Sequence, residues 1–208
     1  MKTEILPAAD PHSLSIALEI LRSGGLVAFP TDTVYGLGAL AFDGDAVTKI
    51  YAAKGRPLEK AIPVLIGDRE DLEKVCSEVP GIARKLAARF WPGPLTLVML
   101  KCPELPESVS AEPTVGVRIP DHPVARALLR LAGPMAVTSA NLSGRQSPST
   151  AQEVFDQLGG RIALILDGGK TPGGVPSTVV DCLRADPQVL RIGAISKNEI
   201  LAVSGQKV

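Results

Sequence analysis

Residues 26–38 read LVAFPTDTVYGLG, and this stretch decides the fold. Its first four residues, Leu26 to Phe29, are apolar and predict a buried strand that ends at Pro30. Hydroxyls and glycines follow at once, from Thr31 to Gly38, and such residues at the end of a strand in an open α/β sheet can form a ligand cradle. A tight turn capped by threonines explains the same residues equally well, so both interpretations stay open.

Strands and helices alternate along most of the chain. Apolar runs predict further strands at residues 62–66, 95–100, 115–119, 135–138, 162–166, 177–181 and 189–192. Helical patterns and capping residues predict helices at residues 13–22, 43–54, 82–90, 122–131, 150–158 and 196–203, with a short one after Asp68. The strands at 95–100 and 115–119 have no helix between them, so we expect an α/β fold with a mixed sheet flanked by helices. No shift of composition marks a second domain, and we expect one domain over residues 1–208.

The composition argues against several classes of protein. The chain has 208 residues, with 22 lysines and arginines against 22 aspartates and glutamates, which does not suit a globally basic nucleic-acid binder. Aromatic residues make up only 3%, too few for a platform that stacks single strands. Cys76, Cys102 and Cys182 lie far apart in no metal-binding pattern, which favours buried thiols in a reducing compartment. We recognise neither a signal peptide nor a membrane span, so we expect a cytoplasmic protein.

Several cations stand where the sequence predicts buried or terminal structure. The segment Lys54-Gly55-Arg56-Pro57 ends a predicted helix, and its two cations either stabilise the helix dipole or clamp an anion. Arg118 lies inside one predicted strand, and Arg191 lies near the end of another. A charge in an apolar strand needs an acidic partner, such as Asp121 or Asp181, or a ligand in a cavity.

Other chemical signatures are weak. Residues Thr138 to Gly144 carry small hydroxyls, an amide and a glycine after an apolar strand, which suits a phosphate or sugar but also describes an ordinary loop. Gly169-Lys170-Thr171 resembles the end of a P-loop, but Leu164 stands where the first glycine belongs. We find no Gly-x-Ser-x-Gly elbow and no histidine-rich metal motif. Catalysis should therefore depend on positioning and charge and not on a Ser-His nucleophile.

Six segments together resemble the YrdC family, the threonylcarbamoyl-AMP synthases. In chain order they are residues 29–37 (FPTDTVYGL), 54–57 (KGRP), 91–96 (WPGPLT), 116–120 (GVRIP), 139–144 (SANLSG) and 176–178 (PST). Each segment is short, but six in the family's order, over about residues 12–195, are specific. The resemblance implies an α/β fold with a twisted mixed sheet around a large basic cavity, in the single-domain form of the family.

The same resemblance implies an activity. Such enzymes condense L-threonine, bicarbonate and ATP into threonylcarbamoyl-adenylate and release pyrophosphate. The substrate phosphates would bind Mg²⁺, with no protein side chain as a metal ligand. A tRNA-modifying transferase complex would then receive the adenylate for threonylcarbamoyladenosine modification of tRNA, and weak binding of tRNA itself is a further expectation.

Roles of individual residues carry over to the positions that match the family's motifs. The resemblance implies that Lys54 and Arg56 are catalytic and bind triphosphate and carboxylate. The residues implied to bind ATP are Arg56, Lys60, Thr114, Thr138, Ser139, Asn141 and Arg191. The residues implied to bind L-threonine are Thr31, Thr33, Tyr35, Arg118 and Ser177. Some relatives place a threonine-binding histidine nine positions after the arginine of the Lys-Gly-Arg motif, where this chain has Leu65.

Two other functions remain compatible with the sequence. An RNA-binding accessory protein of tRNA or ribosome maturation could hold RNA phosphates in a basic cavity, although the neutral charge and few aromatic residues argue against it. A carbamoyl-adenylate-forming domain related to the hydrogenase maturation system would need zinc-finger-like parts, for which the three cysteines provide no pattern.

Overall fold

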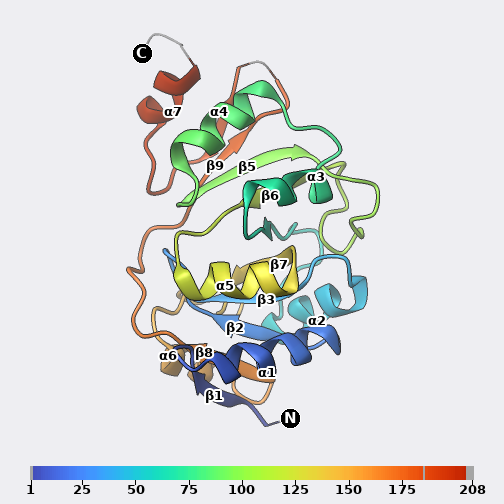
Figure 1. Ribbon diagram of the computed structural model, residues 1–208, viewed down its shortest axis with the longest axis vertical. Helices are drawn as coiled ribbons and strands as arrows, with labels where there is room; N and C mark the ends of the chain where they lie inside the picture. The colour runs from blue at the N-terminus through green and yellow to red at the C-terminus, as the bar shows by residue number, and fades with distance from the viewer. Residues whose placement is uncertain (1, 185, 205–208) are drawn as a thin grey trace.

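The computed structural model describes residues 2–184 and 186–204, and its named strands form one mixed sheet (Figure 1). Across the sheet the ten strands follow the order β1-β8-β2-β3-β7-β4-β6-β5-β9-β10. In chain order they are β1 (Glu4–Pro7), β2 (Val27–Phe29), β3 (Gly36–Leu40), β4 (Val64–Leu65), β5 (Leu95–Leu100), β6 (Thr114–Arg118), β7 (Met135–Ser139), β8 (Leu164–Asp167), β9 (Thr178–Asp181) and β10 (Gln188–Arg191). The expected α/β fold with a mixed sheet is confirmed.

Parallel and antiparallel pairs both occur in the sheet. The parallel pairs are β1 with β8, β8 with β2, β4 with β6 and β5 with β9. The antiparallel pairs are β2 with β3, β3 with β7, β7 with β4, β5 with β6 and β9 with β10. As predicted, no helix separates β5 from β6. The two strands pair antiparallel, because antiparallel neighbours need only a loop between them.

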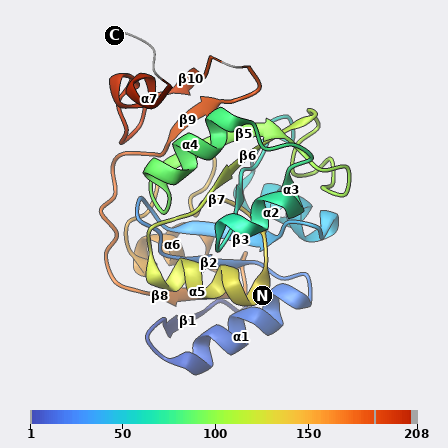
Figure 2. The same cartoon turned by 45° about the horizontal axis from the view of Figure 1, so that its top comes forward.

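Helices cover the sheet on both faces. They are α1 (Pro11–Arg22), α2 (Gly44–Lys54), the 3₁₀ turn η1 (Arg69–Asp71), α3 (Leu72–Val75), α4 (Gly81–Phe90), α5 (Pro123–Ala132), α6 (Ala151–Leu158) and α7 (Lys197–Ser204). Helices α1 and α5 share one apolar cluster with Val27 and Phe29 of β2, whereas α2 and α6 share the other cluster with Ala28. Neighbouring residues of a strand point to opposite faces, so β2 separates the two layers. Figures 1 and 2 show α1 at the β1 end of the molecule and α4 with α7 at the β10 end.

Local sequence explains where α2 begins and ends, and this matters because α2 leads into the Lys-Gly-Arg segment. The Asp43 side chain accepts a hydrogen bond from the Ala46 amide at 2.9 Å and caps the helix. Gly55 ends the helix with φ of 59°, a left-handed conformation that glycine adopts without steric strain. Lys54 therefore stays on the last turn of the helix while Arg56 leaves it in a new direction.

Two strands were not expected from the sequence. Strand β1 is a short edge strand with mostly exposed side chains, so it shows no apolar alternation. Strand β3 begins at Gly36, which the sequence had suggested as part of a turn or a ligand cradle. Its glycines admit close packing: a Cβ added at Gly36 would lie 2.7 Å from Cγ1 of Val137. The strand expected at residues 62–66 is correct in position but shortens to Val64–Leu65.

Two expectations about residue environment can be compared with the structure. Cys76, Cys102 and Cys182 are free and buried, as predicted. Burial raises the pKa of Cys76 and of Cys182 to about 12, so both thiols stay protonated and unreactive at neutral pH. No helix in the described part of the chain is long and apolar enough to span a membrane.

Candidate functional site

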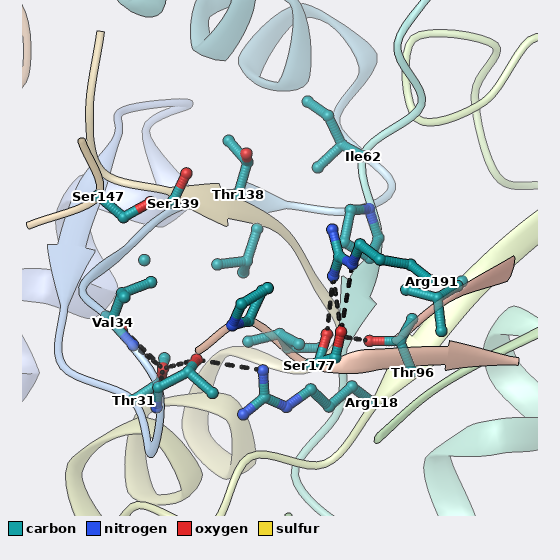
Figure 3. A pocket seen from close by; sticks show the side chains of 18 of the residues that line it. Thr31, Val34, Ile62, Thr96, Arg118, Thr138, Ser139, Ser147, Ser177 and Arg191 are labelled. Atoms are coloured by element: carbon teal, nitrogen blue, oxygen red, sulfur yellow. Dashed lines mark hydrogen bonds between the residues drawn. The ribbon is translucent and has the colours of Figure 1, made fainter. Parts of the chain in front are cut away.

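A cavity of about 630 Å³ lies near the middle of the sheet (Figure 3). The loop after β2 and the end of β7 form one part of its lining, and β5, β6, β9 and β10 form another. The segment that joins β8 to β9 also reaches it, through Gly174, Pro176 and Ser177. In Figure 1 this segment runs in orange along the left side of the molecule, from β8 near the bottom to β9 near the top. The volume is typical of a site for a small molecule.

The charge of the cavity has one sign. Its lining holds three arginines, Arg56, Arg118 and Arg191, and no aspartate or glutamate among the described residues. These arginines come from the segment after α2, from β6 and from β10, so the fold gathers them from distant parts of the chain. Guanidinium groups in a partly enclosed cleft attract anions and offer paired donors to carboxylate or phosphate.

Arg118 is held firmly at the cavity wall. The residue is only 7% exposed, and three protein groups accept its hydrogen bonds. Its Nε donates to the Gly93 carbonyl at 3.0 Å, its Nη1 donates to Thr33 Oγ1 at 3.3 Å, and its Nη2 forms an ion pair with Asp32. The acidic partner is therefore Asp32 and neither of the aspartates suggested from the sequence. Arg118 has both the acidic partner and the exposure to a cavity that the sequence offered as alternatives.

Arg191 and Ser177 form a second fixed group. Arg191 donates from Nε and Nη2 to the Ser177 carbonyl, at 3.2 and 2.9 Å, and from Nη2 to Ser177 Oγ at 3.2 Å. Ser177 Oγ lies 2.9 Å from Thr96 Oγ1 on β5. Figure 3 shows these side chains together, next to Arg118. The sequence indicated Arg191 and Ser177 but gave no role to Thr96.

The two threonines after β2 combine the two interpretations left open by the sequence. Thr31 Oγ1 donates to the Val34 carbonyl at 2.7 Å and accepts from the Thr33 amide at 3.2 Å, so this loop is a turn capped by a threonine. Thr31 and Thr33 also line the cavity, with their hydroxyls 3.0 Å apart. The turn thus presents two fixed hydroxyls beside Arg118.

Lys54 lies behind the cavity wall in this structure. Its Nζ donates to the carbonyls of Ser139 and Asn141, and its own carbonyl accepts from the Ser143 amide at 2.9 Å. Burial, reinforced by the nearby Arg56 charge, lowers the pKa of Lys54 to about 7. Lys54 is not among the residues that line the cavity, whereas Ser139, whose carbonyl it binds, is one of them.

Asn141 is also buried beneath this wall. Its Nδ2 donates to the carbonyls of Leu142 and Arg145, at 2.8 and 2.9 Å. Its Oδ1 is buried and has no hydrogen-bond partner among the residues described. Asn141 therefore shapes the loop with its amide nitrogen and keeps one acceptor unused.

Three further predicted residues do not line the cavity. Tyr35 is fully buried, and its hydroxyl donates to the Gly169 carbonyl at 2.7 Å and accepts from the Gly168 amide at 3.2 Å. Burial raises the pKa of Tyr35 to about 12. Lys60 is exposed, and Thr114 begins β6 at the end opposite Arg118. Of the predicted site residues, the structure brings eight to the cavity: Thr31, Thr33, Arg56, Arg118, Thr138, Ser139, Ser177 and Arg191.

Some lining residues had no assigned role in the sequence analysis. Thr96, Gln146 and Ser147 add polar groups, and Leu65 contributes an apolar side chain at the position where some relatives have histidine. Thr96 could have been suspected, because it ends one of the six segments that carry the family resemblance. Gln146 and Ser147 follow a predicted loop and gave no signal. Within the described ranges, no group of three or more His, Cys, Asp or Glu side chains could hold a metal ion.

Comparison with known proteins gives a consistent result. The family model Sua5/YciO/YrdC, described as telomere recombination, matches residues 19–193. Threonylcarbamoyl-AMP synthase of Bacillus subtilis (strain 168) is 48% identical over 206 residues, which cover 98% of this chain and 59% of that protein. Putative threonylcarbamoyl-AMP synthase of Mycobacterium tuberculosis (strain H37Rv) is 43% identical over 208 residues, 98% of this chain and 96% of that protein.

A solved structure shows the same fold. The crystal structure of P. abyssi Sua5 complexed with L-threonine matches with a TM-score of 0.92 at 43% sequence identity, and the match covers 99% of this chain and 61% of that chain. The present chain thus spans about three fifths of the length of this structure and of the Bacillus subtilis relative.

Proposed function

The chain belongs to the Sua5/YciO/YrdC family, and from this premise we propose that it is a threonylcarbamoyl-AMP synthase. The reaction joins L-threonine, bicarbonate and ATP to give threonylcarbamoyl-adenylate, pyrophosphate and water. The observation that carries this proposal is the cavity itself, in which three arginines and a set of hydroxyls face one space. The substrates are anions that repel one another, so an enzyme for this reaction needs a cationic cavity that gathers them.

We propose that L-threonine binds on the side of Arg118. A guanidinium group that is fixed by three protein contacts offers an oriented site for the amino-acid carboxylate. Thr33 and Ser177 supply hydroxyls on either side of it, and Thr31 lies next to Thr33. The L-threonine complex of a 43% identical structure supports this class of substrate. Tyr35 would contribute from behind, because it holds the backbone at Gly168 and Gly169.

We propose that ATP binds on the side of Thr138 and Ser139. Figure 3 shows these two residues and Ser147 on the side of the cavity opposite Arg118 and Ser177. Arg56 and Arg191 would neutralise the phosphates. Asn141, which does not line the cavity, would act on the nucleotide site through the loop whose carbonyls its Nδ2 binds. Lys54 would act through the carbonyls of Ser139 and Asn141. Lys60 and Thr114, which do not line the cavity, stay proposed contacts to ATP. Magnesium would enter bound to the phosphates of ATP, as part of the substrate.

The chemistry requires no protein nucleophile. The threonine amine adds to bicarbonate with loss of water and becomes an N-carboxylate. An oxygen of this carboxylate attacks the α-phosphorus of ATP, the bond from that phosphorus to the bridging oxygen breaks, and pyrophosphate leaves. The cavity contributes by holding nucleophile and phosphorus in line and by neutralising the charge that develops on the phosphates.

The proposal extends to the fate of the product. A threonylcarbamoyl-adenylate is a reactive mixed anhydride, so a transferase must take it up for threonylcarbamoyladenosine formation in tRNA. We propose such a tRNA-modifying complex as partner, and location in the cytoplasm and weak contact with tRNA stay predictions of the same kind.

The direct test measures pyrophosphate release by the purified protein. We expect release that requires L-threonine, bicarbonate and MgATP together, and a product with the mass of threonylcarbamoyl-adenylate. D-threonine in place of L-threonine should give only background. If all three substrates release no more pyrophosphate than the protein-free mixture, the proposal is wrong.

A further inference from the structure

Two buried polar atoms without partners lie in the segments that surround Arg118. Among the described side chains, Asp32 Oδ2 and His122 Nδ1 are buried and form no hydrogen bond. A buried acceptor and a buried ring nitrogen are each unfavourable when unpaired. Neither residue lines the cavity, and the proposed reaction has so far used neither atom.

Asp32 connects this pair to the cavity. Its Oδ1 binds Nη2 of Arg118, so the carboxylate of Asp32 orients the guanidinium group from behind. The second carboxylate oxygen has no such function in the described structure. The orientation of Arg118 therefore depends on a carboxylate that is fixed through only one of its two oxygens.

His122 lies in the segment that joins β6 to α5, and the charge of Asp32 acts on its ring. It follows Arg118, the last residue of β6, by four residues, and it is the N-cap residue of α5 without a side-chain bond to the helix. Asp32 is the charged group with the largest effect on His122, followed by Asp121, and both raise its pKa. Burial has the larger and opposite effect and lowers the pKa of His122, so the ring is neutral at neutral pH. A neutral imidazole carries one N–H and can present it at Nδ1.

We propose that His122 is a positioning residue, whose Nδ1–H donates to Asp32 Oδ2 in the substrate-bound enzyme and so fixes Arg118 in the orientation that binds the substrate carboxylate. The inference rests on the proposed function for the identity of that carboxylate. It satisfies both unpaired atoms with one hydrogen bond. Binding groups are commonly oriented by a partner that is itself held by a further hydrogen bond. Here Arg118 is the binding group, Asp32 is its partner, and His122 holds Asp32.

The kinetic test compares two substitutions of His122. His122→Ala should raise KM for L-threonine by roughly tenfold and leave KM for ATP near its original value. His122→Asn keeps an N–H donor near the Nδ1 position and should restore most of the loss. His12→Gln is the matched control, because His12 is the second of the two histidines and is exposed on α1. In an Asp32→Asn background, His122→Ala should add little. Equal changes in both KM values, or no rescue by His122→Asn, would overturn the inference.

A second measurement needs no substrate turnover. With only two histidines in the chain, ¹⁵N NMR of the imidazole rings can assign each separately. We expect the His122 ring to be protonated at Nδ1, to change its ring shifts on addition of L-threonine, and to lose both properties in Asp32→Asn, while His12 stays unchanged. A ring protonated at Nε2 and insensitive to Asp32→Asn would refute the pairing. If the wild-type protein releases no pyrophosphate, the proposed function fails, but the NMR result still decides the pairing of His122 with Asp32.

Discussion

Arg118 and Lys54 are both buried cations, and the protein satisfies them in different ways. Arg118 pairs with the Asp32 carboxylate and keeps its guanidinium at the cavity wall. Lys54 meets two backbone carbonyls and no acid among the residues that the structure describes, and its pKa falls to about 7 because of burial. The first arrangement preserves a charge for a ligand, while the second uses an amine to hold a loop. The two residues should therefore respond differently to substitution.

Arg56 gives the sharpest test of activity at the scale of one residue. Arg56→Ala removes a cation from the cavity and should raise the activation free energy by about 2–4 kcal/mol. This corresponds to a fall in kcat/KM of roughly 30- to 1,000-fold. Arg56→Lys keeps the charge without the planar fork and should fall between wild type and alanine. Pyrophosphate release measures the effect, and Arg22→Ala, an exposed arginine at the end of α1, is the control. Near-normal turnover of Arg56→Ala would remove this residue from the site.

Arg56 also holds the segment that follows it, so a melting curve must accompany the kinetics. Its Nη2 donates to the Ala61 carbonyl at 3.0 Å, and its Nε donates to the Lys60 carbonyl at 3.3 Å. A variant that melts like the wild type but loses turnover shows a direct role. If a variant loses thermal stability and turnover together, Arg56 acts by holding the segment that follows it, and its charge in the cavity is not the cause of the lost activity.

Lys54 predicts a pH dependence of stability. The unfolded chain holds this proton up to a pKa near 10.4, while the folded chain releases it at about 7. Between these values the unfolded state binds more protons, so the free energy of unfolding should rise with pH, by at most about 1.4 kcal/mol per pH unit. Lys54→Met should remove this contribution.

Urea unfolding across the same pH window measures that difference. The free energy of unfolding of the wild type minus that of Lys54→Met should increase as pH rises from about 7 towards 10. Lys49→Met, which removes a lysine from the same helix α2, should keep the wild-type dependence. A difference that stays constant with pH would show that Lys54 remains charged in the folded protein.

At the scale of secondary structure, some elements were predictable and others were not. Strand β5 was predicted at its true bounds, because a continuous apolar run between turn residues indicates a buried strand. Strand β3 was missed because Gly36 and Gly38 read as turn residues, although they serve close packing between strands. The same limit applies to the site, where the direction of the Lys54 side chain depends on carbonyls more than 80 residues away. Local patterns contain no information on such contacts.

Gly36 of strand β3 packs too closely against strand β7 to carry a side chain. In the variant Gly36→Ala, the new Cβ would lie 2.7 Å from Cγ1 of Val137 on β7, so the strands must separate or Val137 must move. We expect destabilisation of about 1–3 kcal/mol in denaturant unfolding. The double variant Gly36→Ala with Val137→Ala should recover part of it. Gly81→Ala is the control, because an added Cβ there meets nothing within 4 Å. No recovery in the double variant would show that the contact is not the cause.

At the scale of the whole molecule, the fold brings together groups that are far apart in the chain. Thr33, Arg118, Ser177 and Arg191 belong to four different segments, and only the complete order of strands places them around one cavity. The six short segments predicted this convergence through their resemblance to a family, because no single segment specifies a site. The convergence also places like charges near each other. Burial lowers the pKa of Arg118 against the opposing effect of Asp32, and the Arg191 charge lowers it slightly further.

This crowding of arginines predicts how ligands should affect the stability of the whole protein. An anionic ligand relieves the repulsion and binds only the folded state, so it should stabilise by about 2.7 kcal/mol when its concentration is a hundred times its Kd. MgATP with L-threonine should therefore raise the melting temperature, and sodium chloride at the same ionic strength should raise it much less, since general screening does not bridge the arginines. Arg118→Ala should abolish the additional shift from L-threonine but keep most of the shift from MgATP. If sodium chloride raises the melting temperature as much as the two substrates do, the cavity binds anions without specificity. Only specific contacts can make the protein distinguish a substrate from salt.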